Sequence, residues 1–165
     1  MNFTVVVGHP RPGSPLLTAA RSAAAALAPA ARRDRPEVVD LAEFGPELLW
    51  PQSVPQVDAA VRAVRRSSLL LVASPVLNGT YSGLLKVFAD RLPLLALEGA
   101  VAIPMIMAAD PVRAEAAAED LRALLAELGA TLPAPALTIL DTELSGIGAL
   151  AQAWALQVAE GVRAA

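Results

Sequence analysis

Short apolar runs alternate with longer amphipathic segments along the whole chain. The apolar runs predict five β-strands, at residues 3–8, 37–41, 69–73, 100–109 and 137–140. The third run has four consecutive apolar residues before it ends at Ser74-Pro75. An uninterrupted run of this kind is typical of a parallel strand that is buried on both faces.

Between these runs, apolar residues recur at helical spacing. They predict five helices, at residues 15–27, 52–66, 81–92, 112–128 and 143–162. Regular alternation of strand and helix implies right-handed βαβ units and a parallel sheet with helices on both faces. With no internal repeat and no linker, residues 1–165 are predicted to form a single α/β domain.

Local signals add detail to this outline. Thr80 is expected to cap the third helix, and Gly129 to follow the end of the fourth. Asp110-Pro111 is typical of an N-cap followed by proline in the first turn. Pro104 lies inside a predicted strand, where it lacks an N–H, so a bulge or bend is expected there.

Composition excludes several kinds of function. The chain has no cysteine and one histidine, which excludes thiolate chemistry and disfavours a histidine metal cluster or a Ser-His-Asp triad. The net charge of −3 argues against a nucleic-acid partner. No apolar run approaches the roughly 20 residues that span a bilayer, and no basic segment precedes the first strand. We therefore expect no membrane partner, no signal peptide and a cytoplasmic location.

Two loops are expected to carry the chemistry, because ligands of open α/β sheets bind at the carboxyl ends of strands. Residues 8–14 lead into a helix start, whose N–H groups and dipole suit a phosphate; Arg11 and Ser14 add donors. The same loop could equally be a simple connection with Ser14 as N-cap. Residues 74–80 are rich in backbone donors and suit a flat polar ring. No GxGxxG or GxxxxGK pattern is present, which disfavours a Rossmann dinucleotide site and a P-loop.

Both loops resemble those of the NAD(P)H-dependent FMN reductases, especially the alkanesulfonate-system branch. Residues 8–14 stand where that family has Gly-Ser-Pro-Arg-x-x-Ser, and residues 73–86 follow its motif after the third strand closely. Other family elements match Asp90, Leu92-Pro93, Leu97, Gly99 and Pro104. The resemblance covers most of the chain. It implies a flavodoxin-like three-layer α/β/α sandwich with a five-stranded parallel sheet in the order 2-1-3-4-5, and a family that tolerates proline at 104.

The resemblance implies an NAD(P)H:FMN oxidoreductase that uses FMN and takes a hydride from NADPH or NADH. No catalytic side chain and no metal are expected, because the flavin and the nicotinamide supply the chemistry and the protein positions their rings. A homodimer or tetramer that buries residues 81–92 is also implied, as is a flavin-dependent monooxygenase as partner. The residues implied to bind the cofactor are His9, Arg11, Ser14, Leu16, Pro75, Val76, Leu77, Asn78, Tyr81 and Ala109.

Three departures from the family pattern bear on this interpretation. His9 replaces a phosphate-binding serine, and Leu77 replaces a tyrosine beside the flavin ring. Ala108-Ala109-Asp110 replaces Thr-Gly-Gly, whose glycines let the backbone approach the flavin. A carboxylate there would repel an anionic reduced flavin. Two alternatives therefore stay open: an FMN-binding redox module without independent turnover, and a paralogue that has lost flavin.

Two clusters of charged residues have a purely structural interpretation as well as a functional one. Arg32, Arg33 and Arg35 could meet a nucleotide phosphate or could simply form a solvated loop. Asp141 and Glu143 are expected to favour the dipole of the last helix rather than to act as an acid–base pair.

Overall fold

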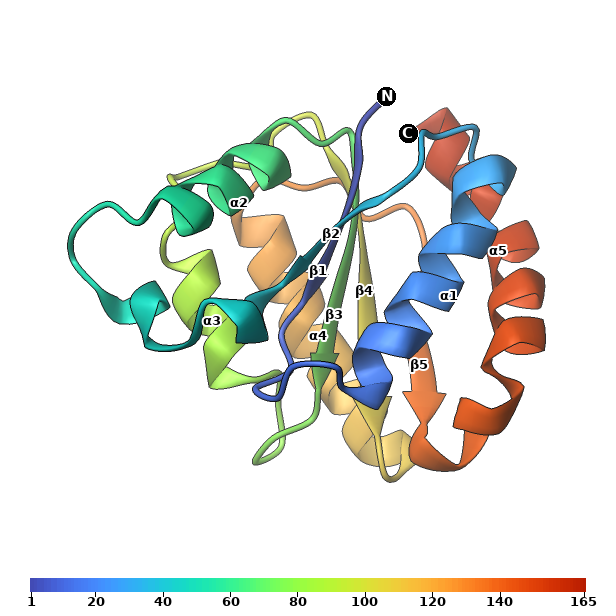
Figure 1. Ribbon diagram of the computed structural model, residues 1–165. Coiled ribbons are helices and arrows are strands. Elements are labelled where there is room, and N and C mark those ends of the chain that lie inside the picture. Colours follow the sequence, from blue (N-terminus) through green and yellow to red (C-terminus); the bar gives the residue numbers. More distant parts are fainter.

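A computed structural model describes residues 1–165 as a twisted parallel sheet between two helical layers (Figure 1). The five strands lie in the order β2-β1-β3-β4-β5 and all pair in parallel. This confirms the flavodoxin-like α/β class and the strand order that the family resemblance implies. The strands are β1 Phe3–Val7, β2 Glu37–Asp40, β3 Leu69–Pro75, β4 Val101–Ala108 and β5 Leu137–Leu140.

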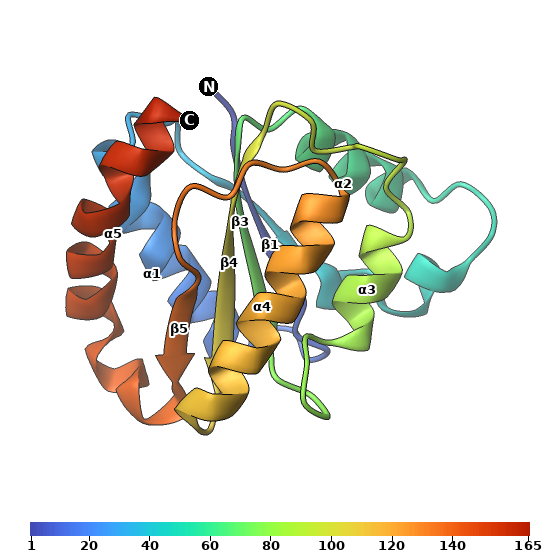
Figure 2. The same cartoon turned by 180° about the vertical axis from the view of Figure 1, so that it is seen from behind.

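Five helices cover the two faces of the sheet. Helices α1 and α5 pack side by side on one face, and α2, α3 and α4 cover the other (Figures 1 and 2). Alternate residues of a strand serve the two layers, so Val5 and Val7 belong to the core under α1 and α5, and Val6 to the core under the other helices. The helices are α1 Pro15–Ala30, α2 Pro55–Arg65, α3 Gly83–Ala89, α4 Pro111–Glu127 and α5 Ile147–Ala164.

Helix starts differ from the prediction at three places. Thr80 is not an N-cap: α3 begins at Gly83, and Ser82 caps it by accepting a hydrogen bond from the N–H of Leu85 at 3.1 Å. Helix α2 begins at Pro55, where proline suits the first turn, rather than at residue 52. The segment Asp141–Gly146 forms a 3₁₀ turn, η3, so that α5 begins only at Ile147.

Helix α3 also ends earlier than predicted, at Ala89, and turns occupy residues 90–99. Other local predictions are confirmed. Gly129 follows α4 with a φ of 93°, a value that favours glycine. Asp110 caps α4 by accepting a hydrogen bond from the N–H of Arg113 at 3.0 Å. None of the helices combines the length and the apolar character needed to cross a membrane.

The bulge expected at Pro104 is absent. Residues 69–75 and 101–107 pair one to one, with Val72 opposite Pro104. Donors alternate in direction along β4: the N–H of Val101 donates toward β3, to Ser68, and that of Ala102 donates away from it, to Thr131. The missing donor of Pro104 therefore faces away from β3, just before β5 pairing begins at Met105. The proline therefore removes no backbone hydrogen bond between neighbouring strands.

Candidate functional site

The carboxyl ends of β1, β3, β4 and β5 meet at one edge of the sheet, around a hollow of about 360 Å³. This is the edge at which open α/β sheets bind ligands. The hollow is lined from four loops by His9, Arg11, Pro15, Pro75, Val76, Met107, Ala108, Ala109, Asp141 and Leu144.

The loop after β1 presents the start of α1 to this hollow. The hydroxyl of Ser14 accepts a hydrogen bond from the N–H of Leu17 at 3.2 Å, which confirms Ser14 as the N-cap. The N–H groups of Gly13, Ser14 and Leu16 donate to no acceptor within the chain. Free donors at the positive end of a helix dipole form a ready anion site. The side chain of Leu16 is fully buried, so this residue can contribute only its N–H.

His9 is held with one ring nitrogen facing this loop. The N–H of Arg11 donates to Nδ1 of His9 at 3.0 Å, so Nδ1 is unprotonated and Nε2 carries the proton. Burial lowers the pKa of His9 below 6.5 and favours the neutral ring. The side chain is 8% exposed and Nε2 has no partner within the chain. Neutral His9 is therefore a donor, in place of the serine hydroxyl of the family motif.

The loop after β3 is a tight two-residue turn. Leu77 and Thr80 exchange backbone hydrogen bonds of 2.9 and 3.4 Å. The residues between them, Asn78 and Gly79, have φ values of 52° and 94°, the geometry of the type I′ turn that Asn-Gly favours. The turn leaves Leu77 42% exposed and the N–H groups of Asn78 and Gly79 free.

Two buried serines fasten this loop to the loop after β1. Ser74 Oγ accepts a hydrogen bond from the N–H of Ser82 at 2.8 Å and donates to the carbonyl of Pro75 at 2.9 Å. Ser82 Oγ donates to the carbonyl of Gly8 while it caps α3. Both side chains are almost inaccessible to solvent. The network fixes the position of one loop relative to the other.

Gly8 is needed for this contact. A Cβ placed on Gly8 would lie 2.7 Å from Cβ of Leu85, a distance that real side chains do not reach. The loop after β1 can therefore lie against the start of α3 only because residue 8 has no side chain.

The loop after β4 is exposed and shaped by the cap of α4. Asp110 turns its carboxylate toward the N–H of Arg113 and lies 3.5 Å from Nε of the same residue. This contact supports the structural role that the sequence predicts for Asp110, as the N-cap of α4. Ala109 lines the hollow, and its N–H has no acceptor within the chain.

The structure brings together five of the ten residues predicted to bind the cofactor: His9, Arg11, Pro75, Val76 and Ala109. Ser14 and Leu16 lie beside them at the helix start, and Leu77 and Asn78 lie on the neighbouring turn. Tyr81 packs instead against the core under α2, α3 and α4.

Sequence reasoning missed the contribution of β5 to the site. Asp141 and Leu144 of η3 line the hollow, as does Met107 of β4. Asp141 follows β5 directly, so its position at a strand end was the available signal. Asp141 begins η3, six residues before the start of α5, rather than the first turn of α5 as expected.

Comparison with known proteins identifies this arrangement. The model of the NADPH-dependent FMN reductase family matches residues 1–143. The chain belongs to this family. It is accordingly an NAD(P)H:FMN oxidoreductase. No curated protein matches the chain.

Solved structures share the fold of this FMN reductase. The apo form of an NADH:FMN oxidoreductase superposes with a TM-score of 0.83 at 23% identity, over 99% of this chain and 88% of the other. An oxidoreductase from Corynebacterium diphtheriae gives 0.82 at 23% identity, over 100% and 98%. A flavodoxin from the domain Archaea gives 0.64 at 18% identity, over 99% of each chain.

The residues of this FMN reductase fit a flavin. The start of α1 offers three free N–H groups and a neutral His9 donor to a phosphate, with Arg11 exposed beside them. The hollow offers apolar surface from Pro75, Val76 and Met107, next to the free N–H of Ala109. An anionic tail and a flat ring with polar edges require this combination of donors and apolar surface.

Proposed function

We propose that this FMN reductase binds FMN across the hollow and transfers to it a hydride from a nicotinamide nucleotide. The observation that carries the proposal is the pairing of an unsatisfied helix start with an apolar hollow at one sheet edge. No group of three or more His, Cys, Asp or Glu side chains could hold a metal ion. Bound flavin supplies the redox chemistry, and the chain supplies binding and orientation.

The phosphate is placed at the start of α1. There Arg11 can reach it with two parallel N–H groups, and His9 can donate from Nε2. The N–H groups of Gly13, Ser14 and Leu16 complete the set of donors. The side chain of Ser14 already caps α1, so its part in phosphate binding is mainly to hold these N–H groups in place.

The flavin ring is placed on Pro75, Val76 and Leu77, with Asn78 and the N–H of Ala109 at its polar edge. The buried serine network holds the β3 loop in place before any ligand binds. Binding therefore loses little conformational entropy from ordering this loop. Asp110 is occupied with Arg113, which reduces its repulsion of an anionic reduced flavin. The family name favours NADPH as donor, and the matched NADH:FMN oxidoreductase favours NADH.

One experiment separates this function from its alternatives. Protein purified with added FMN is examined for flavin absorbance, and NADPH and NADH oxidation is followed with free FMN. Bound flavin together with turnover supports the proposal. Bound flavin without turnover would indicate a redox module, and the absence of both would indicate a paralogue that has lost flavin.

We also propose that the chain forms a homodimer, or a tetramer built from dimers, through the surface around α3. Leu94 and Leu49 are 83% and 71% exposed there, and Trp50 is 43% exposed. The guanidinium of Arg91 donates to the carbonyl of Trp50 at 2.6 Å and holds these two segments together. Clustered exposed apolar side chains favour association.

Light scattering tests this association, since a mass near the 17.0 kDa of one chain would contradict it. The resemblance to alkanesulfonate-system reductases supports a flavin-dependent monooxygenase as the consumer of reduced FMN. Stimulation of such an enzyme by this reductase and NADPH, compared with free reduced flavin, tests that partnership.

A further inference from the structure

A second hollow, of about 550 Å³, lies between α1 and the edge strand β2. One face of α1 forms one wall, with Arg21, Ala25, Ala28 and Pro29 at helical spacing. Pro36 and Val38 also line the hollow, as do Arg33 and Arg35 from the connection that follows α1. We call this hollow the arginine groove.

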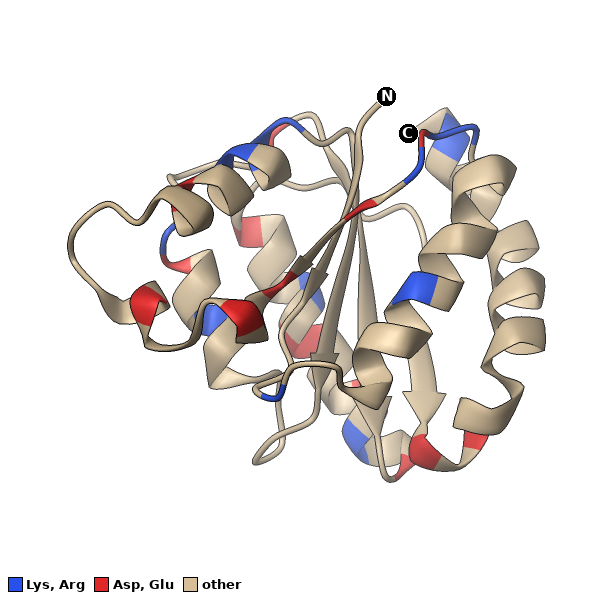
Figure 3. Ribbon diagram, viewed as in Figure 1, with Lys and Arg blue, Asp and Glu red and all other residues tan.

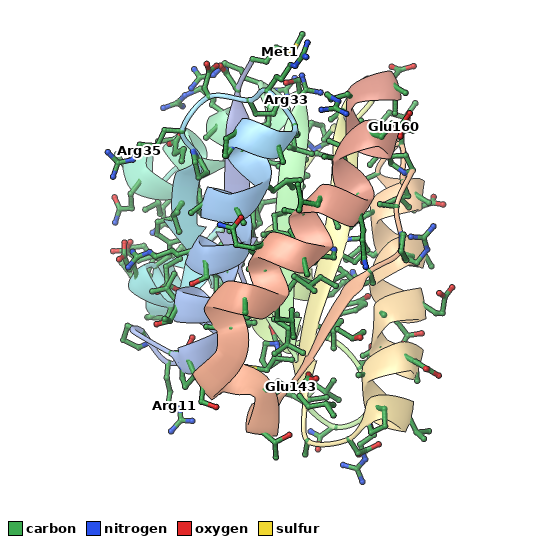
Figure 4. The ribbon with its side chains drawn as sticks, turned by 90° about the vertical axis from the view of Figure 1, so that its right-hand side faces the viewer. Met1, Arg11, Arg33, Arg35, Glu143 and Glu160 are labelled. Carbon is green, nitrogen blue, oxygen red and sulfur yellow. The ribbon has the colours of Figure 1, made fainter.

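The groove is separate from the flavin site. Arg33 and Arg35 lie at the end of α1 opposite to Arg11 (Figure 4). The two hollows share no lining residue. A ligand in the arginine groove would therefore leave the carboxyl edge of the sheet accessible.

The groove concentrates positive charge in a protein whose net charge is −3. Blue segments mark this charge on α1 and on the connection from α1 to β2 in Figure 3. The guanidiniums of Arg21, Arg33 and Arg35 form no ion pair within 4.0 Å. The five ion pairs of the structure involve other cations. The nearby carboxylate of Asp34 binds the N-terminal amino group at 2.5 Å. Glu37 precedes Val38 on β2 and so points to the opposite face of the sheet.

Arg33 has a partly unsatisfied guanidinium at the end of the groove. Its Nη2 donates to the carbonyl of Val162 at 3.4 Å and its Nη1 to Sδ of Met1, which ties it to the last turn of α5 and to the N-terminus. Its Nε is buried and has no hydrogen-bond partner. Arg33 is therefore held at the end of the groove by contacts of its own, which leaves Arg21 and Arg35 as the exposed guanidiniums.

We propose that the arginine groove binds a small organic phosphate with a flat ring, about the size of a nucleoside monophosphate. The volume lies within the range of about 300–1,000 Å³ that is typical of small-molecule sites. Arg21 and Arg35, whose side chains are exposed, would hold the phosphate, because guanidiniums bind its oxygens two at a time. Ala25, Ala28, Pro29 and Val38 offer the apolar surface on which a ring can lie.

Calorimetric titration of FMN-free protein with adenosine monophosphate tests this site, and a variant that lacks two groove arginines separates binding there from binding at the start of α1. Adenosine and inorganic phosphate are titrated in parallel. The variant carries Arg21→Gln and Arg35→Gln, both at exposed positions, so that the fold is retained. Its matched control carries Arg62→Gln and Arg65→Gln, two exposed arginines of α2 on the other face of the sheet.

We expect adenosine monophosphate to bind the natural protein and the control equally, and the groove variant at least tenfold more weakly. FMN affinity should be the same in all three. Adenosine monophosphate that does not bind, or that binds the groove variant and the natural protein equally, would overturn the proposal. Inorganic phosphate with the same affinity as the nucleotide would overturn the role given to the apolar surface.

Discussion

The loops after β1 and β3 are fastened to each other through buried serines, whereas the loops after β4 and β5 carry exposed carboxylates and no hydrogen bond between them. Ser74, near the end of β3, accepts a hydrogen bond from the N–H of Ser82, and Ser82 Oγ donates to the carbonyl of Gly8. Asp110 and Asp141 stand on the second pair, and Asp110 engages only its own helix. We call these the fastened half and the open half of the site.

This difference indicates a division of labour. The fastened half holds the residues that we assign to the phosphate and to one face of the ring, and its geometry is set before ligand binding. The open half is where Ala108-Ala109-Asp110 replaces the family's Thr-Gly-Gly. A change there alters the charge and the approach of the backbone without disturbing the fastened loops.

Replacing Ser82 by alanine should have the largest effect on stability. The carbonyl of Gly8 and the N–H of Leu85 lose their partner in a buried place, and α3 loses its cap. We expect the free energy of unfolding to fall by about 2–4 kcal/mol. Urea unfolding, followed by tryptophan fluorescence, measures it.

The matched control for Ser82→Ala is Asp110→Ala, which removes the cap of α4 in the open half. It should cost only about 1 kcal/mol, because Asp110 is partly exposed and water can replace it. Equal losses in the two variants would mean that the serine network adds nothing beyond helix capping.

Replacing Arg11 by alanine should weaken FMN binding by about 1.5–3 kcal/mol, the range for a hydrogen bond to a charged group. Arg113→Ala, in the open half, removes an equally exposed guanidinium whose partner is Asp110, and should change affinity by at most about 1 kcal/mol. Fluorescence titration of FMN gives both values. Unchanged affinity in Arg11→Ala would refute the placement of the phosphate.

The fold could be predicted from the sequence because each strand is a short apolar run and each helix repeats its apolar positions. Tertiary contacts decided what local signals could not. Thr80 and Ser82 are both good N-caps, and the choice of Ser82 depends on the carbonyl of Gly8, 74 positions earlier in the chain. Likewise, Pro104 does not disturb β4, because its missing donor faces away from β3 where no neighbouring strand yet pairs.

The site could be predicted in part for the same reason. The loops after β1 and β3 are predicted from the sequence as strand ends, and the family resemblance adds Ala109 after β4. His9, Arg11, Pro75, Val76 and Ala109 do meet in one hollow. Asp141 was assigned to a helix because the sequence does not show that a 3₁₀ turn precedes α5. The serine network was missed because Ser74 and Ser82 become partners only when two loops fold together.

Replacing Asp110 by serine tests how the negative charge in the open half affects FMN binding. Serine keeps the N-cap, so stability should change by no more than a few tenths of a kcal/mol. Removing the carboxylate should tighten FMN binding by less than about 1 kcal/mol, because the group is partly exposed and already faces Arg113. Weaker binding in Asp110→Ser would show that the carboxylate contacts the flavin favourably rather than opposing it.

The smallest expected effect is a pH dependence that comes from the fastened half. Burial lowers the pKa of His9 below 6.5, and the charge of Arg11 lowers it further against the opposing charge of Asp40. The unfolded chain therefore binds a proton at higher pH than the folded chain does. The stability associated with neutral His9 is fully present above pH 6.5 and is lost as the pH falls from there through the lowered pKa of the folded state.

His9 is the only histidine, so it is the side chain whose unperturbed pKa falls in this window. Unfolding free energies of FMN-free protein at about pH 5.5 and about pH 7.5 should differ in the natural protein, with the lower value at acid pH. The difference should shrink in His9→Gln, which cannot titrate. Bound FMN should reverse the trend, because a phosphate beside Nε2 favours the protonated ring; the same trend with and without FMN would place the phosphate away from His9.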